Sequence, residues 1–317
     1  MFFIILTQTV VDCNIFLKKL SNFVFKMKTN LWIVKIVKIL LFLDKIERVC
    51  YIINLGYFDG RENMLFALDI GNSNIKLGGF SGDEISFVAS IATDCCATSD
   101  EYSFRILGAL SLYSVNKEDI DGAIISSVVP QLNRIISASV ENIFGVKPLV
   151  VGPGVKTGIG IQCDMPSSVG ADLICASVAA HFIYSSPSLI IDMGTATKLT
   201  AVNKSGAFIG TSIAPGVMLG LNALANGTAQ LPKVSLEAPP SVIGKNTSDC
   251  MKSGIIFGNA AMLDGMIERV REELGEDILV LATGGYASTI LPYCKHKITY
   301  DEHLVLKGLN LIYKRNK

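Results

Sequence analysis

The sequence predicts an α/β fold made of two similar domains, and three observations support this prediction. Apolar runs typical of buried strands alternate with helical stretches along residues 64–317. Each half begins with a meander of strands joined by short Gly-, Asn- and Ser-containing turns. The stretch LDIGNSNIKL at 68–77 also recurs as IDMGTATKLT at 191–200. A repeat of this length favours duplicated domains over a solenoid, although the shared letters are few and a coincidental match is the alternative.

The elements of the first half follow from these runs and from the turns between them. Pro130 opens a helix, because proline at a first helical position costs no backbone hydrogen bond. The predicted strands are 64–69, 75–80, 84–91, 122–129 and 148–152, and the predicted helices are 100–115 and the stretch from Pro130.

The second half shows the same opening followed by helices. A predicted helix at 171–184 precedes this opening, and the predicted helices that follow it are 215–227, 249–275 and 301–313, the last with an acidic first turn. Its predicted strands are 188–193, 197–203, 207–213 and 276–285. We therefore expect a first domain at 64–178 and a second domain at 179–317.

Composition excludes several classes of function. Lys+Arg and Asp+Glu both number 28, which argues against a nucleic-acid surface. Mean hydropathy is high at +0.45, but the apolar run at 31–43 contains two lysines and is shorter than the roughly 20 residues of a spanning helix. No signal peptide is visible. The eight cysteines form no CxxC pair and the histidines have no zinc-ligand spacing, so we expect free thiols in a cytoplasmic protein.

Residues 1–63 lack the alternation of apolar strands and short turns that is seen in residues 64–317. They are rich in Ile, Leu, Phe, Lys and Asn, whereas Met64 begins a clear strand that leads into a glycine turn. We expect Met64 to be the true start and residues 1–63 to be an upstream extension outside the fold. A real N-terminal helical extension is the alternative.

The turn Asp69–Asn74 has the chemistry of a phosphate-binding loop. Glycine allows close backbone approach, and Asn and Ser tolerate tight turns that leave amide hydrogens free for phosphate oxygens. Asp69 at the strand end would hold Mg²⁺, and Lys76 would add positive charge. A plain hairpin turn would have the same letters, so this motif is weak alone.

The second turn, Asp192–Thr197, has the same features of a phosphate-binding loop in the second half. Two such turns facing each other would form a cleft at a domain junction, where small-molecule sites tend to lie. The chain contains neither GxxxxGK[ST] nor a GxGxxG that follows a strand. A nucleotide would therefore be bound by the paired turns.

Three further motifs complete the candidate site. Asp172 in Gly170-Ala171-Asp172-Leu173 stands in the first turn of a helix, where the dipole favours a carboxylate, and it could orient a hydroxyl acceptor. The paired glycines Gly284 and Gly285 end a strand and could pack against a ring or ribose. The segment Gly244–Thr247 precedes a helix and could bind an anion. Two of these motifs have a purely structural alternative, which is a helix-start stabiliser for Asp172 and a strand-to-helix turn for the glycines.

Six motifs of the chain occur in the order found in type III pantothenate kinases: DIGNSNIK, MPSSVGAD, IDMGTAT, IAPG, GKNTSDCMKSG and ATGG. The chain resembles this family from about Met64 to its C-terminus. The resemblance implies duplicated ribonuclease-H-like domains of the acetate kinase/Hsp70/actin superfamily, with mixed five-stranded sheets flanked by helices. It implies ATP-dependent phosphorylation of pantothenate to 4′-phosphopantothenate, the first step of coenzyme A synthesis.

The resemblance also assigns roles. Asp172 would be the catalytic base, Asp69 a Mg²⁺ ligand and Asp192 a ligand of the monovalent cation, K⁺ or NH₄⁺. Thr247 would contact pantothenate across a homodimer interface. The implied ATP-binding residues are Asp69, Ile70, Gly71, Asn72, Ser73, Asn74, Ile75, Lys76, Thr195, Gly284 and Gly285, and the implied pantothenate site is Cys163, Gly170, Ala171, Asp172, Leu173 and Thr247.

Three positions depart from the family pattern. Leu173 stands where the family usually has Arg, and Cys163 where it usually has Tyr. Lys198 stands where Thr is common, and it could compensate for these changes or merely face solvent. Loss of a charge-assisted contact to the pantothenate carboxylate, about 1.5–3 kcal/mol, would raise KM roughly ten- to hundredfold. Two other functions therefore stay open: a kinase for another small hydroxyl substrate, and a catalytically weak relative that acts as a regulatory binding protein.

Overall fold

The computed structural model describes residues 63–275 and 277–317. The predicted extension at 1–63 lies outside these residues apart from Asn63, so its role stays a prediction. Within the described part of the chain, no helix is long and apolar enough to cross a membrane. The described cysteines are all free thiols.

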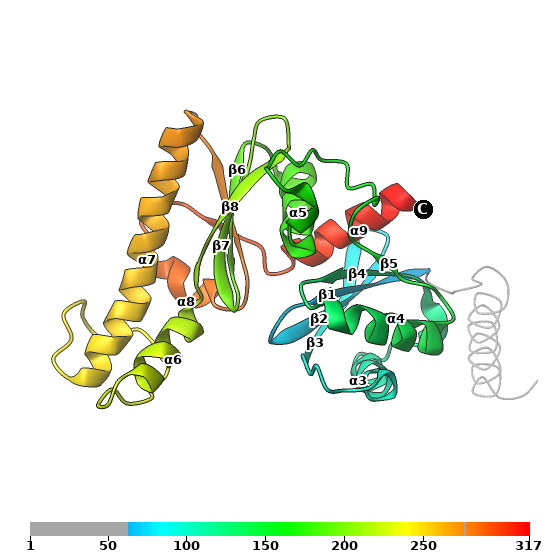
Figure 1. Cartoon of the computed structure of the whole chain (residues 1–317), viewed down its shortest axis with the longest axis horizontal. Helices are drawn as coiled ribbons and strands as arrows, with labels where there is room; N and C mark the ends of the chain where they lie inside the picture. The colour runs from blue at the N-terminus through cyan, green and yellow to red at the C-terminus, as the bar shows by residue number, and fades with distance from the viewer. Residues whose placement is uncertain (1–62, 276) are drawn as a thin grey trace, which may run out of the picture. The chain divides into compact units, whose positions relative to one another are not determined.

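The first sheet is centred on the strand that carries the first predicted phosphate loop. Its strand order is β3-β2-β1-β4-β5, with β1 antiparallel to β2, β2 antiparallel to β3, and β4 and β5 added in parallel on the other side (Figure 1). The strands are β1 (Met64–Ile70), β2 (Asn74–Ser81), β3 (Glu84–Ala92), β4 (Ile120–Ser127) and β5 (Leu149–Val150).

The second sheet repeats this arrangement. Its order is β10-β9-β6-β7-β8, so β6 has an antiparallel meander on one side and two parallel strands on the other, as β1 does. The strands are β6 (Ser188–Met193), β7 (Ala196–Val202), β8 (Phe208–Pro215), β9 (Leu279–Thr283) and β10 (Thr299–Tyr300). The predicted fold, a duplicated α/β unit with mixed five-stranded sheets, is confirmed.

Local signals in the sequence explain where the main helices begin. Thr98 and Glu101 form a reciprocal capping box before α3, Pro130 is the first residue of α4, and the Asn246 side chain accepts from the Asp249 amide at the start of α7. The helices are α3 (Ser99–Leu112), α4 (Pro130–Phe144), α5 (Ala171–Ala179), α6 (Val217–Gly227), α7 (Thr247–Leu274), α8 (Ala287–Ile290) and α9 (Leu304–Asn316). Short 3₁₀ turns lie at Lys117–Asp119, Pro166–Ser168 and Leu291–Tyr293, and a π-helical turn, Ala180–Tyr184, continues α5.

The predicted start of the last helix is wrong. The last helix begins at Leu304 rather than at 301, so Asp301 and Glu302 precede it and its first turn holds no acidic residue. The Asp301 carboxylate is used elsewhere. It accepts hydrogen bonds from Tyr184, Lys307 and the His303 amide, which tie the start of α9 to the end of the π-helical turn.

Helix α5 packs on both sheets, and this places its N-terminus between them. Leu173, Ile174 and Val178 belong to a core cluster with residues of the first sheet and of α9. Ala176, Ala179 and Ala180 belong to a cluster with Ile190 and Leu281 of the second sheet. Every residue from Asp172 to Ala179 is buried, as expected for a helix that is apolar on all sides.

The C-terminal helix returns to the first sheet. Leu306, Leu309 and Ile312 of α9 pack with Leu65 and Ile124 of β1 and β4. Gly308 allows α9 to lie close against α5, because a Cβ atom there would lie 1.9 Å from the Cys175 carbonyl oxygen of α5. The first sheet is thus covered by α3 and α4 on one face and by α5 and α9 on the other, whereas α6, α7 and α8 cover the outer face of the second sheet.

We expect Asp301→Asn to destabilise the protein in a pH-dependent way. Burial alone would raise the pKa of Asp301, but hydrogen bonds from Lys307, Tyr184 and the His303 amide hold it below the ordinary value of 3.8. A lowered pKa contributes stability that is present above the ordinary value and is lost as the pH falls through the lowered one. Loss of such charge-assisted bonds costs about 1.5–3 kcal/mol, so the melting temperature at pH 7 should fall by roughly 4–10 °C.

Urea melts of both proteins between pH 7 and pH 3 would measure this effect. The stability difference between wild type and Asp301→Asn should shrink as the pH falls below 4. The matched control is Asp83→Asn, whose partner Lys314 lies 2.6 Å away in an exposed pair and which should cost little. A difference that stayed constant across the pH range would show that the Asp301 carboxylate is not the source.

Candidate active site

The two glycine turns end equivalent strands. Asp69 is the penultimate residue of β1, and Asp192 is the penultimate residue of β6. Each faces a lysine across the neighbouring antiparallel strand, Lys76 on β2 and Lys198 on β7. In each hairpin that follows the glycine amide donates within the turn, Gly71 N–H to Asn74 O at 3.0 Å and Gly194 N–H to Ala196 O at 3.1 Å, and the second loop is one residue shorter than the first. The repeat seen in the sequence is therefore a repeat in three dimensions.

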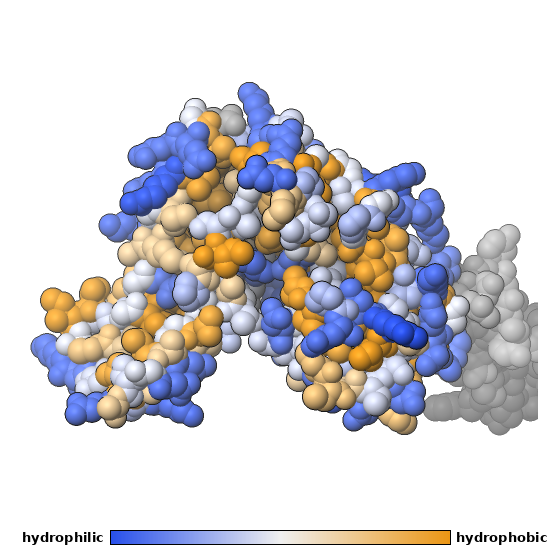
Figure 2. Space-filling model, viewed as in Figure 1, coloured by the Kyte–Doolittle hydropathy of each residue, from blue (hydrophilic) through white to orange (hydrophobic). Residues whose placement is uncertain are grey.

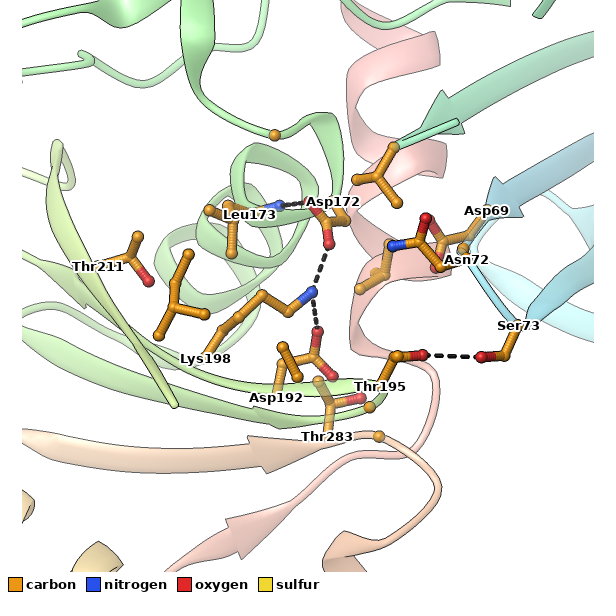
Figure 3. A pocket seen from close by; sticks show the side chains of 18 of the residues that line it. Asp69, Asn72, Ser73, Asp172, Leu173, Asp192, Thr195, Lys198, Thr211 and Thr283 are labelled. Atoms are coloured by element: carbon orange, nitrogen blue, oxygen red, sulfur yellow. Dashed lines mark hydrogen bonds and ion pairs between the residues drawn. The ribbon is translucent and has the colours of Figure 1, made fainter. Parts of the chain in front are cut away.

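The two turns meet. The Ser73 hydroxyl of the first turn and the Thr195 hydroxyl of the second lie 2.9 Å apart, although 122 residues separate them in the chain (Figure 3). Ser73 and Thr195 both line the same pocket. A phosphate chain held by one turn would therefore lie within reach of the other.

A large pocket surrounds this contact. Its volume is about 1220 Å³, and its walls come from both sheets, from the N-terminus of α5, from α6 and from the segment before α9. Figure 2 shows hydrophilic surface inside the hollow between the two halves of residues 63–317. Small-molecule sites are typically clefts of roughly 300–1,000 Å³, so this pocket has room for a nucleotide and a second small molecule.

Asp172 enters the pocket from the first turn of α5. One carboxylate oxygen accepts from the Leu173 amide at 2.9 Å, and the other lies 2.5 Å from Lys198 Nζ. Its side chain is 11% exposed. A carboxylate has about four acceptor positions, so Asp172 can still accept a hydrogen bond from a bound hydroxyl group.

Asp69 lies in a site that disfavours its negative charge. Burial, and then the neighbouring Asp172 and Asp192 carboxylates, raise the pKa of Asp69 to about 7. A divalent cation would relieve this repulsion, and carboxylate oxygens are the ligands that Mg²⁺ prefers. In the described part of the chain no cluster of three or more His, Cys, Asp or Glu could hold a metal by itself. The residues fit a Mg²⁺ ion held by Asp69 together with phosphate oxygens and water.

The environment of Asp192 is different. Its carboxylate lies 2.7 Å from Lys198 Nζ, and the same ammonium group contacts Asp172. A free monovalent cation between these carboxylates would meet a positive charge already in contact with both. The residues present therefore do not fit the monovalent cation that the sequence led us to expect at Asp192.

Most of the predicted site residues line this one pocket. They are Asp69, Gly71, Asn72, Ser73, Asn74, Lys76, Cys163, Gly170, Asp172, Leu173, Asp192, Thr195, Gly284 and Gly285. Ile70 and Ile75 are fully buried in the first core, so only their backbone can serve the loop. Ala171 and Thr247 are outside the lining, and Thr247 is exposed at the start of α7. The functional roles of all these residues stay predictions.

Sequence reasoning missed several pocket residues. Thr211, Asn222, Glu302 and His303 also line the pocket. The Glu302 carbonyl accepts from Lys76 at 3.2 Å, which ties the segment before α9 to the first loop. None of these residues stands in a motif, because they reach the site only through the packing of β8, α6 and α9.

The departures at Leu173 and Cys163 leave an apolar wall. Leu173 is buried, belongs to the core shared with α9 and still faces the pocket, and Cys163 is partly buried beside it. Among the described residues that line the pocket, the lysines and arginines are Lys76 and Lys198 alone. An anionic substrate group therefore finds no arginine on this wall.

Comparison with known proteins identifies the family. A family model described as type III pantothenate kinase matches residues 65–269. The chain is 41% identical over 253 residues to a type III pantothenate kinase of Moorella thermoacetica, which covers 80% of this chain and all of that protein. A solved structure described as a Baf family transcriptional activator from Campylobacter jejuni is 18% identical, with a TM-score of 0.50 over 79% of this chain and 98% of that chain. A ROK hexokinase from Thermus thermophilus aligns with a TM-score of 0.45 at 12% identity, over 80% of this chain and all of that one. The chain belongs to the type III pantothenate kinase family.

Proposed function

We propose that this pocket transfers the terminal phosphoryl group of ATP to the hydroxyl of pantothenate, forming 4′-phosphopantothenate for coenzyme A synthesis. The observation that carries the proposal is the position of Asp172. Its carboxylate projects from α5 beside two phosphate-type turns whose Ser73 and Thr195 hydroxyls are 2.9 Å apart. An acceptor hydroxyl aligned by Asp172 would therefore lie next to a phosphate chain held by those turns.

The phosphate side of the reaction rests on the two turns. The backbone amides of the first turn, with the hydroxyls of Ser73 and Thr195, would hold the phosphate oxygens. Mg²⁺ held through Asp69 would neutralise charge that develops on the phosphates. The end of β9, with Gly284 and Gly285, would pack against the nucleoside.

The acceptor side rests on Asp172. Phosphoryl transfer passes through a loose transition state, so positioning the hydroxyl matters more than removing its proton early. The carboxylate of Asp172 would accept the hydrogen bond of the pantothenate hydroxyl and take its proton as transfer proceeds. Leu173 and Cys163 would contact the rest of the substrate through an apolar surface.

We also propose a cytoplasmic homodimer in which Thr247 completes the substrate site of a second copy. Thr247 is exposed and does not line the pocket of its own chain. Large apolar side chains are also exposed on α6 and in the segment before α7, among them Leu219, Val242 and Ile243. An interface there would cover these side chains.

The direct test is ADP release by the full chain with ATP, Mg²⁺ and pantothenate. We expect ADP only when pantothenate is present, with a KM for pantothenate raised roughly ten- to hundredfold over relatives that have arginine at position 173. ADP release that required a different alcohol would support a kinase for another small hydroxyl substrate, the alternative that Leu173 suggests. Nucleotide binding without turnover on any alcohol would support a regulatory binding protein.

A further inference from the structure

Lys198 occupies the centre of the candidate active site. It lies on β7 directly opposite Asp192, and neighbouring residues across antiparallel strands place their side chains on the same face of the sheet. Its Nζ lies 2.7 Å from Asp192 and 2.5 Å from Asp172, so one ammonium bridges a strand of the second sheet and the N-terminus of α5 (Figure 3). The side chains of Lys198, Asp172 and Asp192 are only 18%, 11% and 18% exposed.

The Lys198 ammonium keeps its charge in this position. Burial alone would lower the pKa of Lys198, but the carboxylates of Asp192 and Asp172 outweigh it and hold that pKa above its ordinary value. The positive charge is therefore present throughout the neutral range. It faces Asp192 from the neighbouring strand, Asp172 from α5 and, at longer range, Asp69 from β1.

The side-chain amine of a lysine in this position is chemically similar to an ammonium ion that is covalently attached to the protein. Ammonium and potassium carry the same charge, are similar in size and bind oxygen ligands. Tethering keeps the ammonium group in the site without a binding equilibrium with the solution. The lysine therefore supplies permanently the charge that a dissolved cation would supply only when bound.

We infer that the Lys198 ammonium replaces a dissociable monovalent cation between Asp172 and Asp192, so that this chain phosphorylates its substrate without K⁺ or NH₄⁺. The inference rests on the proposed kinase function of the pocket. It makes Lys198 a positioning residue, because the group holds the Asp172 carboxylate in place and balances the charge of Asp192.

The test compares wild type with Lys198→Thr in buffers that contain either K⁺ or tetramethylammonium, which is much larger than K⁺ and has no N–H to donate. Wild-type turnover should be the same in both buffers, within about twofold. Removal of a preorganised charge costs roughly 10²-fold or more in kcat, so Lys198→Thr should lose that factor in tetramethylammonium. Saturating K⁺ or NH₄⁺ should restore at least about tenfold, or 1.4 kcal/mol.

Binding measurements provide a second readout that does not depend on activity. Because a ligand that binds only the folded state stabilises it, K⁺ should raise the melting temperature of Lys198→Thr but not that of wild type. Crystals of Lys198→Thr soaked in Tl⁺ should show anomalous density at Asp192, whereas wild-type crystals should show none there. The matched control is Lys204→Thr, the same change at an exposed position of the β7–β8 turn, which should behave as wild type.

The possible outcomes are separable. Wild-type activity that depends on K⁺ would overturn the inference and leave the kinase proposal intact. A Lys198→Thr protein that is folded but gains neither K⁺-dependent activity nor K⁺-dependent stability would also overturn it, since Lys198 would then act as a substrate contact. If pantothenate is not phosphorylated in any buffer, the kinase proposal fails, but the melting and Tl⁺ measurements still decide whether Lys198 fills a cation site.

Discussion

Asp172→Asn should nearly abolish turnover and leave ATP binding largely intact. Asparagine keeps the shape of the side chain but cannot accept the proton of the acceptor hydroxyl, and general-base catalysis contributes about 10²–10⁴-fold. The nucleotide contacts proposed for Ser73, Thr195 and Asp69 come from other elements and do not include Asp172. We therefore expect kcat to fall by that factor while the dissociation constant for ATP changes by less than about threefold, or 0.6 kcal/mol.

Single-turnover kinetics and calorimetric titration with ATP would measure the two quantities separately. A suitable control is Asp121→Asn, which breaks an exposed aspartate–lysine pair of 3.5 Å with Lys317, neither of which lines the pocket. That variant should retain wild-type kcat. Unchanged kcat in Asp172→Asn would remove Asp172 from the proposed mechanism, whereas a parallel loss of ATP binding would assign it to the nucleotide site.

Gly284→Ala should weaken both the fold and the nucleotide site. Gly284 has a φ of +94°, which L side chains rarely adopt, and a Cβ atom there would lie 2.6 Å from backbone atoms of Met193. Met193 ends β6 directly before the second turn, and its carbonyl accepts from the Tyr286 amide at 3.2 Å. Alanine would push the end of β9 away from the second turn, because a backbone contact cannot be relieved by rotating a side chain.

Overpacking and backbone strain each cost about 1–3 kcal/mol, so Gly284→Ala should lower the melting temperature by roughly 5–15 °C. The KM for ATP should rise at least about tenfold, because proximity and orientation of the second turn are lost. Thermal melts and ATP titrations at a temperature where the variant is still folded would check both effects.

The neighbouring glycine offers the matched control. A Cβ atom on Gly285 would meet nothing within 4 Å, so Gly285→Ala should leave the melting temperature almost unchanged. Any effect of Gly285→Ala on ATP affinity would then report on packing of the nucleoside, without a change in the fold. Equal melting temperatures for the two variants would contradict the geometry argued for Gly284.

Strand and helix positions could be predicted because their signals are local. The apolar run 188–193 is β6 to the residue, and Pro130 is the first residue of α4. The duplicated topology could be predicted from the repeat around Asp69 and Asp192, since in both halves an apolar strand ends in Asp and is followed by a glycine turn and an antiparallel strand. The start of α9 was misplaced because Asp301 is held by Tyr184 and Lys307, which are contacts from outside its own segment.

The sequence by itself determined the α/β class, the two glycine turns with their aspartates, the kinase family and the identity of Lys198 as a departure. Only the tertiary structure decided what Lys198 does. The pairing of Lys198 with Asp192 across neighbouring strands follows from a local hairpin. Its contact with Asp172, 26 residues earlier in the chain, exists because α5 packs against both sheets and brings that carboxylate to the same ammonium group. Side chains that meet through packed helices leave no pattern in the order of residues, since that contact depends on the shapes of both cores rather than on spacing along the chain.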